Sequence, residues 1–168
     1  MKPMTPTSYY STFPTGLGPF SVAVNEAGAI VATAFGGVDE LIDRCGGAHF
    51  SADEDRTKEA RDQITGYLDG RRADFNLRLA AKGSPFQQRV WAALCQIPRG
   101  ETRSYGDVAR ALQSSARAVG RANAMNPICV IVPCHRVIGA DGTLTGFAFG
   151  EEIKARLLSL EGVELSRP

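Results

Sequence analysis

Residues 104–126 read SYGDVARALQSSARAVGRANAMN, and this stretch indicates two short helices in succession. Ser104 followed by Asp107 has the spacing of a capping box, which opens a helix. After a break at Gln113-Ser114, Ser115 can cap a second helix that runs to about the end of the stretch. Two short helices with so tight a connection predict a helix-turn-helix.

The second of these helices carries small residues along one face. Ala116, Gly120 and Ala124 recur at every fourth position, and Arg117 and Arg121 each follow one of them. Small side chains let a backbone approach a partner closely, and the two arginines can reach beyond that backbone. The competing interpretation is that this face packs against the neighbouring helix.

A thiol follows the helical pair, beside one of the two histidines in the chain. The segment Pro133-Cys134-His135-Arg136-Val137 comes directly after the apolar run 128–132, which we interpret as a strand. A thiol is a useful nucleophile only as thiolate, so a neighbouring proton acceptor and cationic surroundings suit a reactive cysteine. A core cysteine at the end of a strand, with its histidine and arginine facing solvent, is the alternative that the pentapeptide alone leaves open.

Residues 1–82 predict a small α/β domain. Apolar residues alternate over 20–24, and a turn leads into a returning strand over 29–35. A helix is predicted to start near residue 53 and to end at Gly70, where a glycine can terminate it. Residues 75–79 alternate again and predict one more strand.

Residues 83–168 predict a mainly helical domain. Its first helix has a strong start signal, with Ser84 as N-cap, Pro85 at the first helical position and Gln87 three residues beyond the cap. A last helix is predicted over about 151–160, after a loop that is punctuated by glycines.

The charge of the chain is distributed unevenly. The net charge is +1 overall, but residues 1–81 carry −3 and residues 82–168 carry +4. Several arginines fall between Arg99 and Arg121, where they form either a solvated face or a surface that attracts DNA phosphates. The sequence shows no apolar stretch long enough for a membrane span and no apolar core of a signal peptide at its start. We therefore expect a cytoplasmic protein with no membrane partner.

The cysteines predict neither a disulfide framework nor a metal site. They are too sparse and too irregularly spaced for a disulfide scaffold, and they are Cys45, Cys95, Cys129 and Cys134. Cys45 and His49 have the spacing of two ligands on one helical face, but Gly46-Gly47 disfavours a helix there and no second ligand pair is evident. We expect no bound metal.

These segments together resemble the O6-alkylguanine-DNA alkyltransferases, also called methylated-DNA–protein-cysteine methyltransferases. The resemblance is dense from about residue 84 to 162 and weaker before it. The matching motifs are Ser84-Pro85-Phe86-Gln87, Val90-Trp91, Ile97-Pro98, Gly100-Glu101-Thr102, Ser104-Tyr105, Arg117-Ala118-Val119-Gly120, Asn126-Pro127, Pro133–Val137, Leu144-Thr145-Gly146, Leu157-Leu158 and Glu161-Gly162.

The resemblance implies a fold and a mode of DNA binding. Residues 1–82 would form a structural α/β domain with a ribonuclease-H-like sheet, and residues 83–168 would form a mainly α domain with a winged-helix-like helix-turn-helix. In this family the helix-turn-helix lies in the minor groove, and an arginine takes the place of the flipped-out nucleotide; Arg117 would have that role. The other residues implied to contact DNA are Tyr105, Ala116, Gly120, Arg121 and Ala124.

The resemblance also implies DNA repair without a cofactor. Cys134 as thiolate would take the alkyl group from guanine O6 and would keep it, so each molecule would act once. The sequence leaves open whether O4-alkylthymine is a second substrate. His135 would act on Cys134 through a bridging water, and Glu161 would orient the histidine. Tyr105 would neutralise the charge developing on the departing guanine, and Asn126 would brace the turn around the site. The base pocket would be lined by Val137, Phe147 and Ala148.

Two substitutions and one spacing depart from the family pattern. Phe147 stands where a tyrosine is expected, and Phe149 stands where a glycine is usual. Tyr105 and Arg117 are 12 positions apart, which predicts an unusually tight turn between the two helices. The expected partner is double-stranded DNA that carries O6-alkylguanine, bound by a monomer; the sequence leaves open whether several molecules bind side by side.

Three other functions compete with this interpretation. A non-catalytic relative that binds alkylated DNA would lack the reactive cysteine, whereas Cys134 is present. A cysteine hydrolase would need a histidine that touches the thiol directly, and besides the adjacent His135 the chain offers only His49. A transcription factor would leave Pro133–Val137 and Glu161 unexplained.

Overall fold

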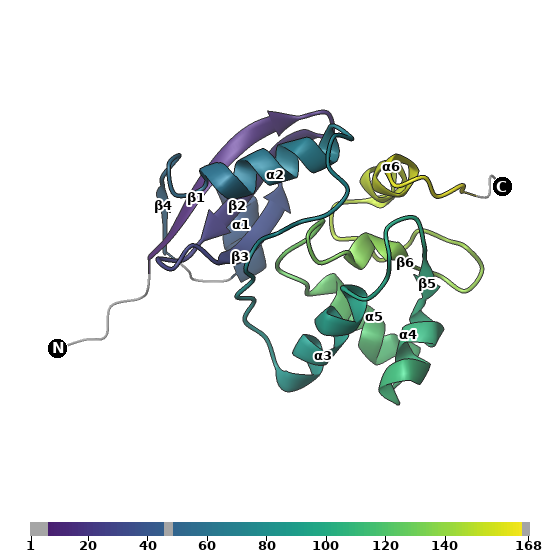
Figure 1. The fold of residues 1–168 in the computed structure, drawn as a ribbon. Helices are drawn as coiled ribbons and strands as arrows, with labels where there is room; N and C mark the ends of the chain where they lie inside the picture. Colours follow the sequence, from purple (N-terminus) through teal and green to yellow (C-terminus); the bar gives the residue numbers. More distant parts are fainter. Residues whose placement is uncertain (1–6, 46–48, 166–168) are drawn as a thin grey trace. The chain divides into compact units, whose positions relative to one another are not determined.

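The computed structural model describes residues 7–45 and 49–165. The chain divides into two compact units, and the division falls between Lys82 and Gly83 (Figure 1). Residues 46–48 separate Cys45 and His49, the two side chains considered as metal ligands, and they lie outside the described part.

The N-terminal unit is built on a mixed four-stranded sheet (Figure 1). Its strands are β1 (Thr7–Thr15), β2 (Gly18–Val24), β3 (Ile30–Phe35) and β4 (His49–Ala52), in the spatial order β3-β2-β1-β4. β1 pairs antiparallel with β2, β2 pairs antiparallel with β3, and β4 pairs parallel with β1. The predicted strands over 20–24 and 29–35 are confirmed, whereas β1 and β4 were not predicted.

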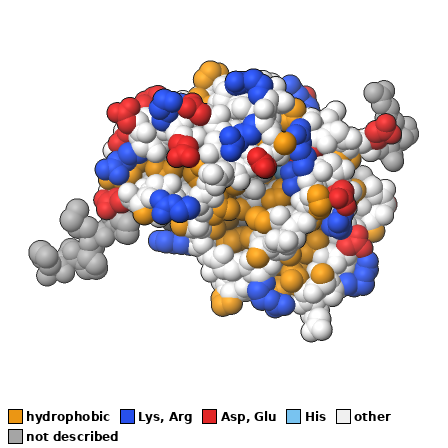
Figure 2. Space-filling view, viewed as in Figure 1, with side chains coloured by type: hydrophobic (Ala, Val, Ile, Leu, Met, Phe, Trp, Pro, Cys, Tyr) orange, Lys and Arg blue, Asp and Glu red, His pale blue; other side chains and the backbone are white. Residues whose placement is uncertain are grey.

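Local signals explain the hairpin between β2 and β3. The Asn25 side chain accepts a hydrogen bond from the Ala29 amide at 3.0 Å, and Gly28 adopts a φ of 84° that favours glycine. Consecutive residues of β2, including Phe20, Ser21 and Val22, are fully buried, so both faces of this central strand are covered. On the face drawn in Figure 2, basic and acidic side chains are interspersed over this unit.

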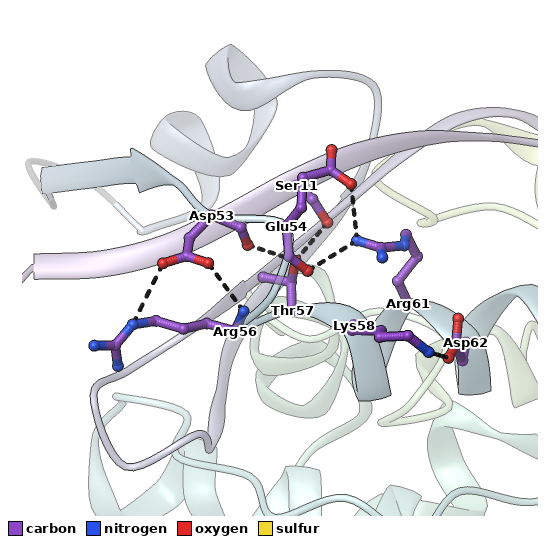
Figure 3. Close-up of polar contacts among 8 residues, drawn as sticks. All are labelled: Ser11, Asp53, Glu54, Arg56, Thr57, Lys58, Arg61 and Asp62. Atoms are coloured by element: carbon purple, nitrogen blue, oxygen red, sulfur yellow. Dashed lines mark hydrogen bonds and ion pairs between the residues drawn. The ribbon is translucent and has the colours of Figure 1, made fainter.

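The helices of the N-terminal unit are α1 (Val38–Cys45) and α2 (Lys58–Leu68). α2 was predicted to start near residue 53, but it starts at Lys58. A hydrogen-bonded turn precedes it, in which the Asp53 carboxylate accepts from the Arg56 amide at 3.0 Å and the Thr57 hydroxyl donates to the Asp53 carbonyl at 2.8 Å (Figure 3). These bonds satisfy backbone groups that a longer helix would have used.

The predicted strand over 75–79 is wrong. Within the described residues this segment makes only an isolated bridge, between Leu79 and Ile30. The side chain of Gln63 on α2 forms hydrogen bonds with both backbone polar groups of Asn76. Its amide nitrogen donates to the Asn76 carbonyl at 3.2 Å, and its oxygen accepts from the Asn76 amide at 2.9 Å. A side chain thus replaces the neighbouring strand as hydrogen-bond partner.

The C-terminal unit is mainly helical (Figure 1). Its helices are α3 (Pro85–Leu94), α4 (Tyr105–Leu112), α5 (Ala116–Ala124) and α6 (Glu151–Leu160). Their predicted start signals are confirmed: Ser84 and Ser104 each form a capping box, and the Ser115 hydroxyl accepts from the Ala118 amide at 3.1 Å.

The connection between α4 and α5 is as tight as the short spacing predicts. Gln113 ends α4 in the left-handed region with a φ of 53°, and the Ser114 amide donates to the Ala109 carbonyl at 2.9 Å. α5 is also tied to α3, because the buried Trp91 indole nitrogen donates to the Ala122 carbonyl at 2.9 Å.

The apolar run 128–132 was interpreted as a strand, and this is wrong. The Val132 amide donates to the Ile128 carbonyl and the Ile131 amide donates to the Cys129 carbonyl, both at 2.9 Å, which closes tight turns. Val130, at the centre of the second bond, has a φ of 72°, a γ-turn geometry that is rare for a β-branched residue. The backbone groups that a strand would pair are therefore used inside the segment.

Cys134 and His135 lie in a short 3₁₀ helix, η1 (Cys134–Arg136), and not in a strand. Directly after it, β6 (Val137–Ile138) pairs parallel with β5 (Arg103–Ser104). This two-stranded ribbon brings the start of α4 next to the segment that follows the cysteine, although the two are far apart in sequence.

We expect Thr57→Val to destabilise the N-terminal unit. The Thr57 side chain is fully buried and its hydroxyl is hydrogen-bonded to the Ser11 hydroxyl at 2.8 Å (Figure 3), so valine would leave buried polar groups without a partner. The expected loss is about 1–3 kcal/mol in the free energy of unfolding, measured by urea denaturation or amide exchange in β1 and α2. Lys58→Ala, which removes only an exposed ion pair with Asp62, is the control and should change stability little. Equal stability of the two variants would contradict this account.

Candidate active site

A buried histidine–carboxylate pair lies directly beside Cys134. The His135 Nε2 is 3.0 Å from the Glu161 Oε2, and both side chains are completely inaccessible to solvent. His135 belongs to η1, whereas Glu161 is the C-cap of α6, so two distant segments meet here. Buried polar and ionisable groups require hydrogen-bond partners, and His135 and Glu161 are partners of each other.

Arg136 supplies the positive charge of this cluster. Its Nε donates to Glu161 Oε1 at 2.9 Å and its Nη2 donates to Glu161 Oε2 at 2.8 Å. Its Nη1 donates to the Ile97 carbonyl at 2.7 Å. Burial raises the pKa of the Glu161 carboxyl, whereas the bidentate guanidinium favours the carboxylate form.

His135 is a neutral imidazole at neutral pH. Burial lowers its pKa to about 3, and the charges of Arg136 and Lys154 lower it further in the same direction. The Nδ1 atom has no hydrogen-bond partner among the described residues, although it is buried. With Nε2–H directed at a carboxylate, Nδ1 is left as a proton acceptor.

The backbone around Cys134 is held by two asparagines. Asn126 Nδ2 donates to the Val132 carbonyl at 3.0 Å and its oxygen accepts from the Ile128 amide at 3.0 Å, which spans the turns before the cysteine. Asn123 on α5, which was not singled out from the sequence, donates to the Cys134 carbonyl at 3.3 Å. The Cys134 side chain is itself buried, at 5% exposure.

Tyr105 opens α4 immediately after the β5–β6 ribbon. Its hydroxyl donates to the Thr145 carbonyl at 3.0 Å. Burial raises the pKa of this hydroxyl, negative charge on Cys134 raises it further, and a hydrogen bond from Asn123 lowers it. Gly146 leaves room for the ring, because a Cβ at that position would lie 2.7 Å from the Tyr105 hydroxyl.

Lys154 is a buried cation that sequence reasoning missed. Its ammonium donates to the Val137 carbonyl at 2.6 Å and to the Thr145 carbonyl at 3.3 Å, and it lies 5.9 Å from the centre of the Tyr105 ring. Burial lowers its pKa to about 8. The available signal was an ionisable residue three positions before Leu157, on the apolar face of the last helix.

The residues predicted to contact DNA line one open groove. Its volume is about 480 Å³, and its lining residues are Tyr105, Ala116, Arg117, Gly120, Arg121, Ala124, Thr145 and Gly146. The small-residue face of α5 therefore faces a groove along at least part of its length. Thr145 and Gly146 were not predicted for this surface.

The residues predicted for a base pocket differ in their exposure. Val137 is fully buried in β6, Phe147 is 9% exposed, and Ala148 is exposed. The Phe147 ring contacts the Phe149 ring edge-on, with 5.8 Å between the ring centres. Both substituted positions of the loop thus pack against each other.

Neither a metal cluster nor a membrane span is found in the described chain. Within residues 7–45 and 49–165, no three His, Cys, Asp or Glu side chains group closely enough to hold a metal ion. No helix in the same residues has the length and apolar character that a bilayer crossing requires.

Two models of protein families match the chain. Residues 8–81 match the model for the 6-O-methylguanine DNA methyltransferase, ribonuclease-like domain, and residues 85–163 match the model for the DNA binding domain of the same family. The chain belongs to the 6-O-methylguanine DNA methyltransferase family. This confirms the resemblance drawn from the sequence motifs.

Individual proteins that are similar to this chain carry the name of the same family. A protein of Methanosarcina acetivorans named methylated-DNA–protein-cysteine methyltransferase is 43% identical over 92% of this chain and 98% of its own length. A protein of the same name from Mycobacterium tuberculosis is 50% identical over 67% of this chain and 70% of its own length.

Solved structures extend the similarity to the fold of this methyltransferase family. Mycobacterium tuberculosis OGT in complex with DNA matches with a TM-score of 0.81 and 40% identity, over 91% of this chain and 92% of that one. The O6-methylguanine-DNA methyltransferase of Pyrococcus kodakaraensis matches with a TM-score of 0.65 and 29% identity, over 93% and 99% of the two chains.

We expect acid to destabilise the protein through His135. The unfolded histidine takes up a proton near its ordinary pKa of 6.5, whereas the folded one resists protonation until near pH 3, so stability falls as pH drops from 6.5 towards 3. The steepest expected loss is about 1.4 kcal/mol per pH unit, seen as a falling melting temperature. His135→Gln should flatten this dependence, and His49→Gln, at an exposed position, should keep it. Identical pH dependence in both variants would refute the assignment.

Proposed function

We propose that this protein repairs alkylated DNA by moving the alkyl group from O6-alkylguanine, methyl in the simplest case, to its own Cys134. The observation that carries the proposal is the buried Glu161–His135 pair next to the cysteine, with a free proton acceptor at Nδ1. Family membership supports the same reaction class. The activity is that of a methylated-DNA–protein-cysteine S-methyltransferase.

The reaction is a single displacement. The Cys134 proton passes to His135 through a bridging water, and the sulfur attacks the alkyl carbon. The bond from that carbon to O6 breaks, its electron pair stays on guanine, and guanine regains a proton from the site, for which the Tyr105 hydroxyl is the candidate donor. The products are S-alkylcysteine and unmodified guanine.

The protein acts once. A thioether is not a leaving group that water displaces, so the alkyl group remains on Cys134 and the molecule is consumed. No cofactor takes part, because the substrate carries the group that is transferred. O4-alkylthymine presents a similar alkylated oxygen and is the candidate second substrate.

DNA binding is assigned to residues 83–168, and residues 1–82 form a structural domain. We infer that α4 and α5 act as a winged-helix-like helix-turn-helix in the minor groove, and that the N-terminal sheet is ribonuclease-H-like. The open groove supports this assignment, because small residues along α5 permit close approach to DNA. Arg117 fills the space of the extruded nucleotide, which offsets part of the cost of unstacking.

The flipped base is assigned to a pocket near the cysteine. Val137, Phe147 and Ala148 line it, and Asn126 keeps the preceding turn in place. The partner is double-stranded DNA with O6-alkylguanine, bound by a monomer. A reactive thiol needs a reducing compartment, which supports action in the cytoplasm.

Intact mass is the direct measurement of transfer. After incubation with an excess of duplex DNA carrying one O6-methylguanine, we expect each chain to gain one methylene, mapped by peptide digestion to Cys134. The gain should stop at one equivalent because the thioether is stable.

Cys134→Ser is the control for this measurement. It should bind the same DNA and show no mass gain, while Cys129→Ser, at the buried cysteine five positions earlier, should be alkylated normally if it folds. Unchanged mass of the unmodified protein with tight lesion binding would point to a recognition protein instead.

We expect Arg117→Ala to slow alkyl transfer from duplex DNA without slowing alkyl transfer from a free base. Loss of the inserted side chain should slow transfer from duplex DNA by about tenfold or more, because base extrusion costs a few kcal/mol. Transfer from the free base O6-benzylguanine should be unchanged. Arg110→Ala on α4, where the side chain is exposed and pairs with Asp107, is the matched control. Equal slowing on both substrates would contradict this role.

A further inference from the structure

Glu161 stands where a carboxylate is disfavoured. It is the C-cap of α6, so it lies at the negative end of a helix dipole, and its side chain is completely buried. Burial raises the pKa of this carboxyl to about 8, which by itself would leave it protonated at neutral pH. Its ionisation at pH 7 therefore depends on its partners.

The protonation of Glu161 decides which nitrogen of His135 carries the proton. A carboxylate only accepts, so it requires Nε2–H and leaves Nδ1 as an acceptor. A neutral carboxylic acid would donate to Nε2 and move the imidazole proton to Nδ1. The Nδ1 atom would then be a donor and could not receive a proton from the thiol.

We propose that Arg136 is the positioning residue that sets the tautomer of His135, by holding Glu161 as a carboxylate. This inference rests on the proposed function, because it concerns the acceptor used by Cys134. Two charged hydrogen bonds, at 2.9 and 2.8 Å, engage both carboxylate oxygens, and a third at 2.7 Å fixes the guanidinium to the Ile97 carbonyl. Burial lowers the pKa of Arg136 to about 10, so the guanidinium remains charged at pH 7.

The other charges around the pair do not replace Arg136. The ionisable groups come from η1, from the end of α3 with the loop after it, and from α6, and they are the thiols of Cys134 and Cys95 and the charged side chains of Arg99, Glu151 and Lys154. Arg99 donates to the Leu160 carbonyl at 3.0 Å, and Lys154 donates to the carbonyls of Val137 and Thr145. The guanidinium of Arg136 is bidentate on Glu161.

The tautomer can be measured without any alkyl transfer. In protein labelled with ¹⁵N-histidine, long-range proton–nitrogen spectra distinguish Nε2–H from Nδ1–H, and the chain has only two histidines to assign. We expect Nε2–H at His135 in the unmodified protein and a shift to Nδ1–H in Arg136→Gln at pH 7. Arg99→Gln, which removes a neighbouring guanidinium, should keep Nε2–H. An Nδ1–H tautomer in the unmodified protein, or unchanged Nε2–H in a folded Arg136→Gln, overturns the proposal.

Kinetics provide the second readout. Transfer from O6-methylguanine duplex should be about tenfold slower in Arg136→Gln at pH 7, and the rate should recover as Glu161 ionises above pH 8. Methylguanidinium added to the buffer should restore part of the rate at pH 7. A uniform loss at every pH without rescue would mean a merely structural role. Absence of transfer by the unmodified protein would defeat the proposed function, and the tautomer measurement would still decide the role of Arg136.

Discussion

The C-terminal unit depends on one buried carboxylate. Glu161 joins the end of α6 to η1 through His135 and Arg136, and Arg136 in turn reaches the segment after α3 at Ile97. A buried charge is tolerated only when it is paired. Loss of one partner leaves the remaining charge buried without compensation, which strongly destabilises the folded protein. The same contacts that hold three segments together thus give His135 its orientation.

The turn before Cys134 is the second constraint. Val130 takes a backbone conformation that is unfavourable for its side chain, and Asn126 supplies hydrogen bonds to both sides of the turn. Strain of this kind persists only where the surroundings determine the conformation. The result is a cysteine at the start of η1, beside the ribbon of β5 and β6 that leads into Tyr105. Nucleophile, acceptor and tyrosine are therefore placed by backbone structure.

Sequence signals succeeded where they act locally and failed where a distant partner decided. The starts of α3 and α4 were predicted because Ser84 and Ser104 each form a capping box with the residue three positions later in the chain. The apolar run 128–132 was misread as a strand because it is apolar and largely buried, whereas its backbone hydrogen bonds close turns within the segment. Segment 75–79 failed for a related reason, since Gln63 on α2 takes the hydrogen bonds that a strand would make. β1 was missed because its polar residues do not alternate clearly.

The sequence by itself determined the starts of α3, α4 and α5, the thiol beside its histidine and the small-residue face of α5, because each is encoded by neighbouring residues. Its motifs also pointed to the family. Only the tertiary structure decided that Lys154 and Asn123 reach the site, and that Arg136 grips both oxygens of Glu161. These contacts join segments far apart in sequence, and their partners are selected by packing and by the need to pair buried charge. No local pattern contains that information.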